Sequence, residues 1–206
     1  MAVKIKICGI TNIEDAIRAE SLGADAIGFI LYKKSKRYVS PVEIKKITNE
    51  LSPLTMKVGV FVNETLENIN KVSKETGINV VQIHGNEQPD ILSSLSLPAI
   101  KAFRVNDEFD FIKLDDYMDF SILLDAHSDN NYGGTGQKFN WEIIPDDIRG
   151  KIILAGGISI ENLDIIVKKI KPAGIDLSSS LEAEPGKKDK SKMEKFFKKV
   201  NQLRRQ

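Results

Sequence analysis

The amino-acid sequence predicts an α/β protein, a single-domain (β/α)8 barrel that spans residues 1–206. Short runs rich in Val and Ile recur eight times, and stretches of helical periodicity separate most of them. This alternation repeats roughly every 20 to 30 residues, as parallel βαβ units do. Eight such units close naturally into a barrel, and an open, doubly wound sheet is the alternative.

Eight short apolar runs predict the strands. They cover residues 3–8, 25–30, 57–62, 79–84, 97–103, 121–126, 151–156 and 173–178. In the first run, VKIKIC, apolar residues alternate with Lys4, Lys6 and Cys8, which strand geometry places together on one face. If the isoleucine face meets the helices, Cys8 points into the mouth of the barrel.

Four spacers carry apolar residues at steps of three and four and predict helices. They cover residues 13–23, 41–51, 66–77 and 161–171. Asn12, Ser40 and Ser159 stand just before three of these helices, where a side chain caps the free N–H groups of the first turn. Gly23 and Gly77 stand where C-caps are expected.

The remaining spacers are less regular. Residues 106–119 have weak helical periodicity, and the stretch after the sixth strand is expected to be a long loop followed by a short helix. The lysine-rich C-terminal run carries Met193, Phe196, Phe197 and Val200 at helical spacing. This pattern favours an amphipathic closing helix over an arm that binds RNA, because no aromatic residues are interleaved for base stacking.

Composition excludes several classes of protein. Lys and Arg total 30 against 29 Asp and Glu, so a net charge of +1 gives no long-range attraction to nucleic acid or to an anionic membrane. One cysteine rules out an internal disulfide framework and a multi-cysteine zinc site. The start lacks a signal-type apolar segment, and no run of about 18 apolar residues occurs. We therefore expect a cytoplasmic protein.

Two residues at predicted strand ends are candidates for acid–base chemistry. The catalytic groups of a barrel come from the C-terminal ends of its strands. Cys8 ends the first strand, and Asp125 lies at the end of the sixth. A thiolate takes a proton from carbon, and a carboxylic acid opposite protonates an oxygen. The alternatives are that Cys8 is a buried apolar residue and that Asp125 caps the following turn.

Glycines and serines follow the last three predicted strands. The candidates for phosphate binding are Gly134, Gly136, Gly156, Gly157, Ser179 and Ser180. Glycine lets backbone N–H groups approach an anion closely, and serine adds a hydroxyl donor. Because barrels recurrently bind phosphate after their last strands, this placement predicts a phosphate site.

Several blocks of sequence, in order and nearly from end to end, resemble one family. They are KICGIT, GADAIGFI, KSKRYVSP, VGVFVN, VQIHG, ILLDA with YGGTGQKFNW, LAGGI, and DLSS with PGKKD. Together they resemble phosphoribosylanthranilate isomerase, a family of the tryptophan pathway. The resemblance implies a (β/α)8 barrel without a cofactor. It also implies conversion of N-(5-phosphoribosyl)anthranilate to 1-(2-carboxyphenylamino)-1-deoxyribulose 5-phosphate, which is an Amadori rearrangement.

The resemblance also implies roles for single residues. Cys8 matches the general base of the family, and Asp125 matches its general acid. Arg37 matches the position that holds the anthranilate carboxylate, a task suited to a planar guanidinium. From the residues alone, a solvated charge in a basic run is the favoured interpretation of Arg37. His84 and Arg104 are further candidates for substrate binding, and a structural histidine is the alternative for His84.

Two positions depart from the family pattern. Ser180 stands where the family usually has Gly, and a side chain there costs about 1 kcal/mol or more if the loop requires a positive φ. Ser180 could instead present another hydroxyl to the phosphate. Asn140 replaces a more usual Asp, and either residue caps a helix.

Lys6 lies on the same face as Cys8 and needs a carboxylate partner inside a barrel, because an unpaired buried charge is costly. The first strand of a closed barrel neighbours the eighth, which carries Asp176. We therefore predict an ion pair between Lys6 and Asp176, or failing that a contact with Asp125. Asp176 thereby joins the candidate substrate site, and the Lys6 charge favours the Cys8 thiolate. The alternative is an inverted strand with Lys6 in solvent.

Other functions stay open at this point. The chain could be another phosphosugar isomerase, epimerase or aldolase-like lyase, or an inactive protein that binds a phosphorylated ligand. A lyase that forms a Schiff base needs a lysine at a strand end, and Lys101 is the only mid-strand candidate. The expected partner is a small phosphorylated aminosugar, with no metal, nucleic acid or membrane, and the protein is a monomer or a homodimer.

Overall fold

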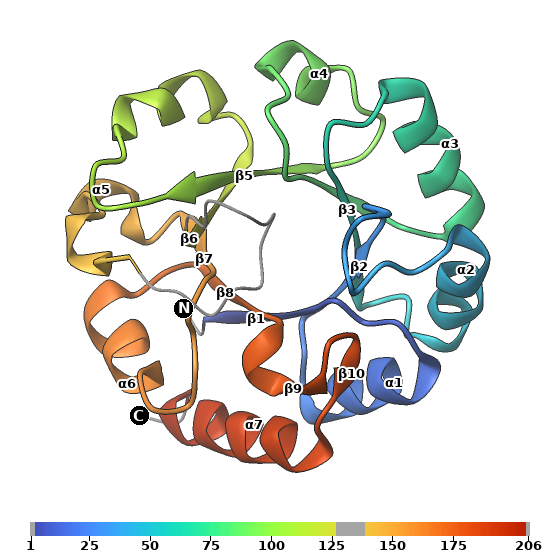
Figure 1. The fold of residues 1–206 in the computed structure, drawn as a ribbon. Helices are drawn as coiled ribbons and strands as arrows, with labels where there is room; N and C mark the ends of the chain where they lie inside the picture. The colour runs from blue at the N-terminus through green and yellow to red at the C-terminus, as the bar shows by residue number, and fades with distance from the viewer. Residues whose placement is uncertain (1–2, 127–138, 205–206) are drawn as a thin grey trace.

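The structure, a computed structural model, describes residues 3–126 and 139–204. Its main sheet is a closed barrel of parallel strands in chain order, which Figure 1 shows as a ring. The strands are Lys4–Cys8 (β1), Ala26–Ile30 (β2), Met56–Phe61 (β3), Val80–Ile83 (β4), Ala99–Val105 (β5), Ser121–Ala126 (β6), Ile152–Leu154 (β7) and Gly174–Leu177 (β8). The predicted (β/α)8 barrel is confirmed, and the alternative of an open, doubly wound sheet is wrong.

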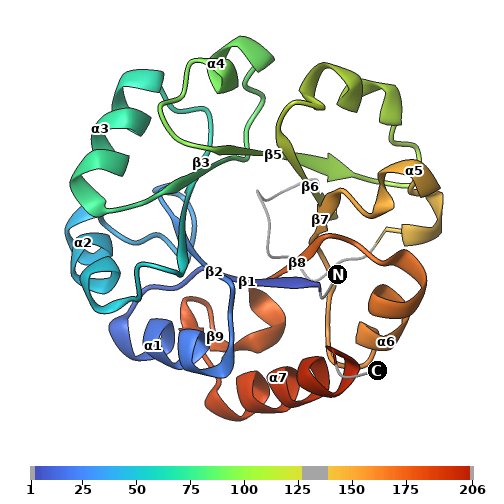
Figure 2. The ribbon, with the colours of Figure 1, turned by 180° about the vertical axis from the view of Figure 1, so that it is seen from behind.

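Most of the helices surround this ring, as the view from behind in Figure 2 also shows. They are Ile13–Leu22 (α1), Pro41–Glu50 (α2), Leu66–Thr76 (α3), Pro89–Ser93 (α4), the 3₁₀ helices Phe111–Tyr117 (η1) and Trp141–Ile143 (η2), Asp146–Arg149 (α5), Leu163–Ile165 (α6) with the π-helical turn Ile166–Ile170 (η3), the 3₁₀ helix Ser179–Leu181 (η4), and Lys190–Arg204 (α7). The weak spacer after β5 is thus a 3₁₀ helix. A hairpin of Glu182–Glu184 (β9) and Lys187–Lys188 (β10) follows β8.

Side chains cap the first two helices as predicted. The Asn12 and Ser40 side chains accept backbone N–H groups in the first turns of α1 and α2. Gly23 and Gly77 end α1 and α3 in the left-handed conformation, with φ of 105° and 76°. Since this conformation is easy for glycine alone, these helices stop where the sequence indicates. Asn140 also caps η2, as expected.

The predicted cap at Ser159 is wrong. The Asn162 side chain accepts a hydrogen bond from the Ser159 N–H and donates one to the Gly157 carbonyl. These two bonds stabilise a turn at the place where the sequence predicts the first helical residues, so α6 begins only at Leu163.

The two faces of β1 lie in different layers, as predicted from its alternation. Ile5 and Ile7 are fully buried in the core between the sheet and the helices. Lys6 and Cys8 are also buried, but on the face that lines the barrel. A separate apolar cluster with Val58 of β3 and Leu123 of β6 fills the interior below them. The interior is therefore apolar at its centre and polar at its mouth.

Helix α7 is the predicted amphipathic helix. Its apolar residues Met193, Phe196, Phe197 and Val200 are buried in the core. In Figures 1 and 2, α7 lies beside α1, and an Arg18–Glu194 ion pair joins the two helices. The C-terminal helix thus completes the outer layer next to the first helix. None of the helices in the described part of the chain is both long and apolar enough to cross a membrane.

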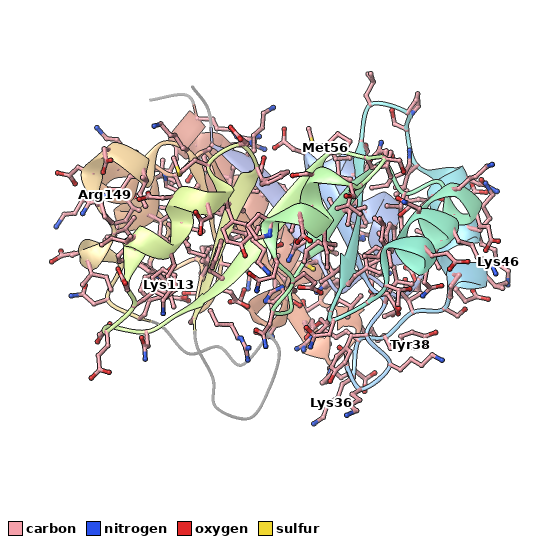
Figure 3. All side chains as sticks on the ribbon, turned by 90° about the horizontal axis from the view of Figure 1, so that it is seen from above. Lys36, Tyr38, Lys46, Met56, Lys113 and Arg149 are labelled. Carbon is pink, nitrogen blue, oxygen red and sulfur yellow. The ribbon has the colours of Figure 1, made fainter. Side chains whose placement is uncertain are left out.

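The loops that follow the strands gather at one end of the barrel. Figure 3 shows Lys36 and Tyr38, which follow β2, at one end and Met56, which begins β3, at the opposite end. The C-terminal ends of β1, β4, β6 and β8 therefore carry Cys8, His84, Asp125 and Ser178 to the same rim.

Candidate active site

Cys8 ends β1 and lines the mouth of the barrel. Gly28 of β2 is its register partner. A side chain at Gly28 would lie 2.8 Å from Cys8 Sγ, so a glycine leaves the space that the sulfur occupies. Gly9 follows with φ of +75°, which lets the chain turn directly after the cysteine. Cys8 is 6% exposed, and its neighbour on the same face is the charged Lys6, so the buried thiol lies in polar surroundings.

Lys6 and Asp176 form a buried ion pair, and this prediction is confirmed. Lys6 Nζ lies 3.0 Å from Asp176 Oδ1, with side chains 5% and 10% exposed. The pair joins β1 to β8 at matched register. Burial raises the pKa of the Cys8 thiol, whereas the Lys6 ammonium acts in the opposite direction and favours the thiolate. Burial also raises the pKa of Asp176, and Lys6 again opposes the change.

Asp125 lies on the inner face of β6, next to a histidine. Its Oδ2 is 3.4 Å from Nε2 of His84, which directly follows β4. His84 Nδ1 in turn lies 3.0 Å from the side-chain nitrogen of Gln82. Arg104 of β5 is the register partner of Asp125. The carboxylate of Asp176 interacts electrostatically with both Asp125 and His84. The structure therefore brings these candidates together around one opening.

Arg37 turns back from the loop after β2 over the end of β1. A side chain at Gly9 would lie 2.8 Å from Arg37 Cδ, so the arginine packs against the residue that follows Cys8. Its Nη2 lies 2.7 Å from Oε2 of Glu182, and its side chain is 13% exposed. The alternative of a solvated charge in a basic run is therefore wrong.

The glycines after β7 have backbone conformations that favour glycine. Gly156 and Gly157 have φ of +78° and +65°. A side chain at Gly156 would lie 2.5 Å from the Ala126 nitrogen and 3.0 Å from Asp125 Oδ1. Gly156 thus brings this loop against the end of β6. Gly134 and Gly136, the other candidate glycines, lie outside the described residues.

The serines after β8 form part of the rim. Ser179 and Ser180 lie in η4, and Ser180 does not have a positive φ. A serine in place of the usual family glycine therefore causes no backbone strain here, because the positive φ on which the expected cost depended does not occur. The buried hydroxyl of Ser178 has no hydrogen-bond partner in the described part of the chain.

Sequence reasoning missed two residues of this region, Glu182 and Lys188. Glu182 contacts Arg37 and Lys188, and all three side chains are largely or fully buried. The sequence segments that contain these two residues are easy to recognise. Strand or helix periodicity, however, does not predict which side chains a residue of a short hairpin contacts. A buried arginine in need of a carboxylate is the signal that could have found Glu182.

The arrangement provides the groups for acid–base chemistry on an anionic ligand. It has a thiol beside an ammonium group, a carboxyl group beside an imidazole, and a guanidinium at the same rim of the barrel. Within residues 3–126 and 139–204, no three His, Cys, Asp or Glu side chains are grouped to hold a metal ion.

Comparisons with known proteins agree with this site. The profile of the N-(5'phosphoribosyl)anthranilate (PRA) isomerase family matches residues 5–199. An N-(5'-phosphoribosyl)anthranilate isomerase from Trichlorobacter lovleyi is 43% identical over 197 residues, covering 95% of this chain and 96% of the relative.

Solved structures agree in fold as well. The crystal structure of phosphoribosyl anthranilate isomerase from Thermotoga maritima has a TM-score of 0.90 at 39% identity, over 97% of this chain and 99% of that one. A phosphoribosyl anthranilate isomerase in complex with reduced 1-(o-carboxyphenylamino)-1-deoxyribulose 5-phosphate has a TM-score of 0.86 at 38% identity, with the same coverage. This chain belongs to the N-(5'-phosphoribosyl)anthranilate isomerase family.

Proposed function

We propose that this protein converts N-(5-phosphoribosyl)anthranilate to 1-(2-carboxyphenylamino)-1-deoxyribulose 5-phosphate in tryptophan biosynthesis. The observation that carries the proposal is the placement of Cys8 and Asp125 at the ends of β1 and β6, on the inner face of one rim. Family membership and the relative bound to a reduced product support the same reaction.

Asp125 is the general acid in this proposal. It donates a proton to the ring oxygen of the ribose, the bond from that oxygen to C1 breaks, and a protonated Schiff base forms. His84 Nε2 lies 3.4 Å from the Asp125 carboxylate, on the β4 side of the mouth. Arg104, the register partner of Asp125, adds a cation on the side of the mouth where the ring opens.

Cys8 is the general base. Its thiolate takes the proton from ribose C2, and the electron pair moves toward C1 and the iminium nitrogen to give an enolamine. The enolamine becomes the ketone when its C2 hydroxyl loses a proton and C1 gains one. Burial disfavours the thiolate, so the Lys6 ammonium, itself held by Asp176, compensates for part of that cost.

Charged and polar groups of the rim bind the two anionic ends of the substrate. We assign the anthranilate carboxylate to Arg37. We assign the phosphate to the loops after β6, β7 and β8, with Gly134, Gly136, Gly156, Gly157, Ser179 and Ser180. The positive φ of the β7 glycines supports this assignment, because such a loop exposes its N–H groups to an anion.

A Schiff-base lyase loses support from the position of Lys101. Its strand neighbours Ile100 and Ala102 face the barrel interior, so Lys101 faces the helix layer. There its ammonium donates to the Gly85 carbonyl at 2.7 Å and lies 5.8 Å from the ring centres of Phe103 and Tyr117. Burial lowers the pKa of Lys101, but the amine lies on the helix side of β5, bound to the Gly85 carbonyl.

Loss of the fluorescence of phosphoribosylanthranilate tests the function. Wild-type protein is expected to turn it over, whereas Cys8→Ala and Asp125→Ala each lose activity by about 10²–10⁴-fold or more. Both variants are expected to bind the reduced product nearly as well as the wild type. A different phosphosugar enzyme would leave the fluorescence unchanged in all three proteins. Location in the cytoplasm and a monomeric or homodimeric state stay predictions, the latter testable by light scattering.

A further inference from the structure

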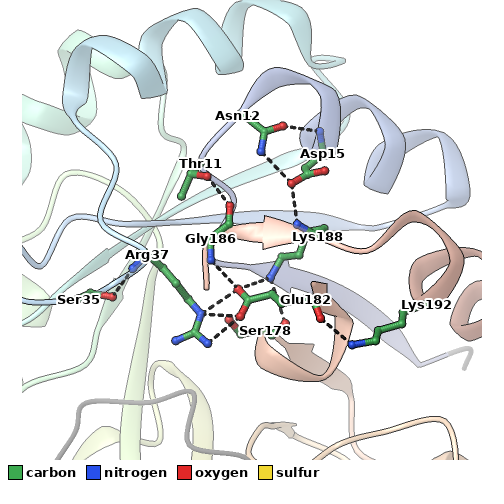
Figure 4. A network of polar contacts seen from close by, with 10 residues as sticks. All are labelled: Thr11, Asn12, Asp15, Ser35, Arg37, Ser178, Glu182, Gly186, Lys188 and Lys192. Atoms are coloured by element: carbon green, nitrogen blue, oxygen red, sulfur yellow. Dashed lines mark hydrogen bonds and ion pairs between the residues drawn. The ribbon is translucent and has the colours of Figure 1, made fainter. Parts of the chain in front are cut away.

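Glu182 holds the Arg37 guanidinium along one edge, as Figure 4 shows. Arg37 Nε lies 2.8 and 3.0 Å from the two carboxylate oxygens of Glu182, and Nη2 lies 2.7 Å from Oε2. A planar guanidinium bound along two of its nitrogens cannot rotate freely. The third nitrogen, Nη1, is not used by this carboxylate.

Packing against the backbone also restricts the direction of the Arg37 side chain. The Arg37 side chain packs over Gly9, where an added Cβ would lie 2.8 Å from Arg37 Cδ. Gly9 directly follows Cys8, so the held guanidinium lies close to the proposed base. The thiolate form of Cys8 interacts electrostatically with Arg37, which agrees with this proximity.

Glu182 is the first residue of the β9–β10 hairpin, and other residues of that hairpin hold its carboxylate. Lys188 Nζ lies 3.1 Å from Glu182 Oε1 and donates to the Ser178 carbonyl at 3.0 Å. The Gly186 N–H donates to the same Oε1 at 3.3 Å. The backbone N–H of Lys188 donates to Asp15 at the start of α1, at 2.8 Å. The carboxylate is therefore held by Gly186 and Lys188, and Lys188 is in turn bound to the residue after β8 and to α1 (Figure 4).

The charge of this group is not balanced. One carboxylate, Glu182, faces two cations, Arg37 and Lys188, so these three side chains carry a net charge of +1 when all are ionised. Burial lowers the pKa of Lys188, whereas Glu182 and the Cys8 thiolate favour its ammonium form. With Arg37 and Glu182 alone, the pair would be neutral and would attract an anion only weakly. The side chains of Lys188 and Glu182 are 0% and 4% exposed, so water screens this charge poorly.

We propose that Glu182 and Lys188 are positioning residues that set Arg37 for the carboxylate of the substrate. Through them the hairpin determines the preference for an anthranilate over an arylamine without a carboxylate. This inference rests on the role of Arg37 in the proposed function. Glu182 supplies the direction of the guanidinium, and Lys188 supplies the charge that Glu182 would otherwise cancel.

The test compares two substrates, N-(5-phosphoribosyl)anthranilate and N-(5-phosphoribosyl)aniline, which lacks the carboxylate. For Glu182→Gln and for Lys188→Met, we expect kcat/KM on the anthranilate to fall about ten-fold or more relative to the aniline, mostly through KM. Lys188 also favours the Cys8 thiolate, but both substrates need that thiolate, so the ratio between them cancels this effect.

Four further variants make the result decisive. Glu194→Gln is the matched control, because Glu194 forms an exposed ion pair with Arg18 and should leave the substrate preference unchanged. Arg37→Met should abolish the preference, and adding Glu182→Gln to it should have no further effect on the preference. The double variant Glu182→Gln/Lys188→Met leaves Arg37 without its carboxylate but removes the fully buried Lys188 ammonium, so it is less costly than Glu182→Gln alone if that single variant does not fold.

The outcomes separate the inference from the function on which it rests. If Arg37→Met abolishes the preference but Glu182→Gln, Lys188→Met and the folded double variant keep it, the positioning role is overturned and the function stands. If Arg37→Met itself keeps the preference for the anthranilate, the assignment of Arg37 to the carboxylate is wrong. A loss of preference in the folded double variant supports the inference even where a single variant does not fold.

Discussion

On the β1 and β8 side of the barrel mouth, Cys8 is surrounded by buried ion pairs, with Lys6 held by Asp176 at 3.0 Å and Arg37 held by Glu182 at 2.7 Å. On the β4 to β6 side, Asp125 meets His84 at 3.4 Å, longer than an ordinary hydrogen bond. Cys8, the proposed base, therefore depends on fixed charges around it, because a buried thiol does not ionise readily without them. Asp125, the proposed acid, has an imidazole rather than a close ion pair as its neighbour at that distance.

The largest difference between the two sides is expected from Lys6→Met. The substitution leaves the Asp176 carboxylate buried and unpaired, which costs about 3–5 kcal/mol of unfolding free energy. It also removes the cation that favours the thiolate, so the pH profile of Cys8 alkylation should move to higher pH. Urea denaturation and the rate of iodoacetamide alkylation measure the two effects, and Cys8 is the single cysteine of the chain.

Lys4→Met is the control for this variant. Lys4 belongs to the same strand and pairs with Asp25, but its side chain is 71% exposed. Its loss should cost less than about 1 kcal/mol and leave the alkylation profile in place. Equal effects of the two substitutions would contradict the special role of the buried pair.

A smaller effect on the same side depends on pH. Burial raises the pKa of Glu182, but Arg37 and Lys188 outweigh it and hold the net pKa below its usual value. The stability from this carboxylate is therefore present above the unfolded pKa of about 4.3 and is lost as pH falls through the folded pKa. The difference in unfolding free energy between wild type and Glu182→Gln should shrink below about pH 4. A difference that is constant from neutral to acid pH would contradict the ion pair.

On the acid side, His84→Gln should have a modest effect on stability. The contact with Asp125 is longer than a hydrogen bond, so the main loss is the contact of His84 with Gln82, worth about 1 kcal/mol. Urea denaturation of His84→Gln and of Lys6→Met, each compared with the wild type, measures the two losses of unfolding free energy. A cost for His84→Gln as large as that of Lys6→Met would remove the contrast between the two sides.

The smallest effect is expected at Ser180. Because Ser180 does not have a positive φ, replacing it by glycine relieves no backbone strain. Glycine should instead lower the free energy of unfolding by about 0.5–1 kcal/mol, because it increases the entropy of the unfolded chain. Ser180→Gly should therefore be slightly less stable by urea denaturation, and its KM should stay within about two-fold if the backbone rather than the hydroxyl binds phosphate. A more stable Ser180→Gly variant would mean that the loop does require the family glycine.

Much of the base side was predictable from strand geometry alone. Alternation in VKIKIC places Lys6 and Cys8 on one face, and closure of the barrel brings β8 with Asp176 beside β1. These are local and topological rules that hold before any side chain is placed. Strand ends alone made Cys8 and Asp125 candidates for acid–base chemistry, and the resemblance implied which is the base and which the acid.

The residues that were missed depend on contacts between distant, irregular segments. Arg37 and Glu182 are 145 positions apart, and both lie outside regular helices or long strands. Periodicity says nothing about which carboxylate such an arginine meets. The late start of α6 was missed for a related reason, since the Asn162 side chain binds two backbone groups that precede it and stabilises a turn.

Isotope exchange at ribose C2 tests most directly whether a thiol and a carboxyl group act on one substrate across the mouth. With substrate deuterated at C2, the wild-type protein should release deuterium to water in step with product, as NMR would detect. Cys8→Ala and Asp125→Ala should release none on that timescale while still binding the reduced product. Deuterium release by Cys8→Ala at the wild-type rate would show that another group takes the proton and would contradict the proposed mechanism.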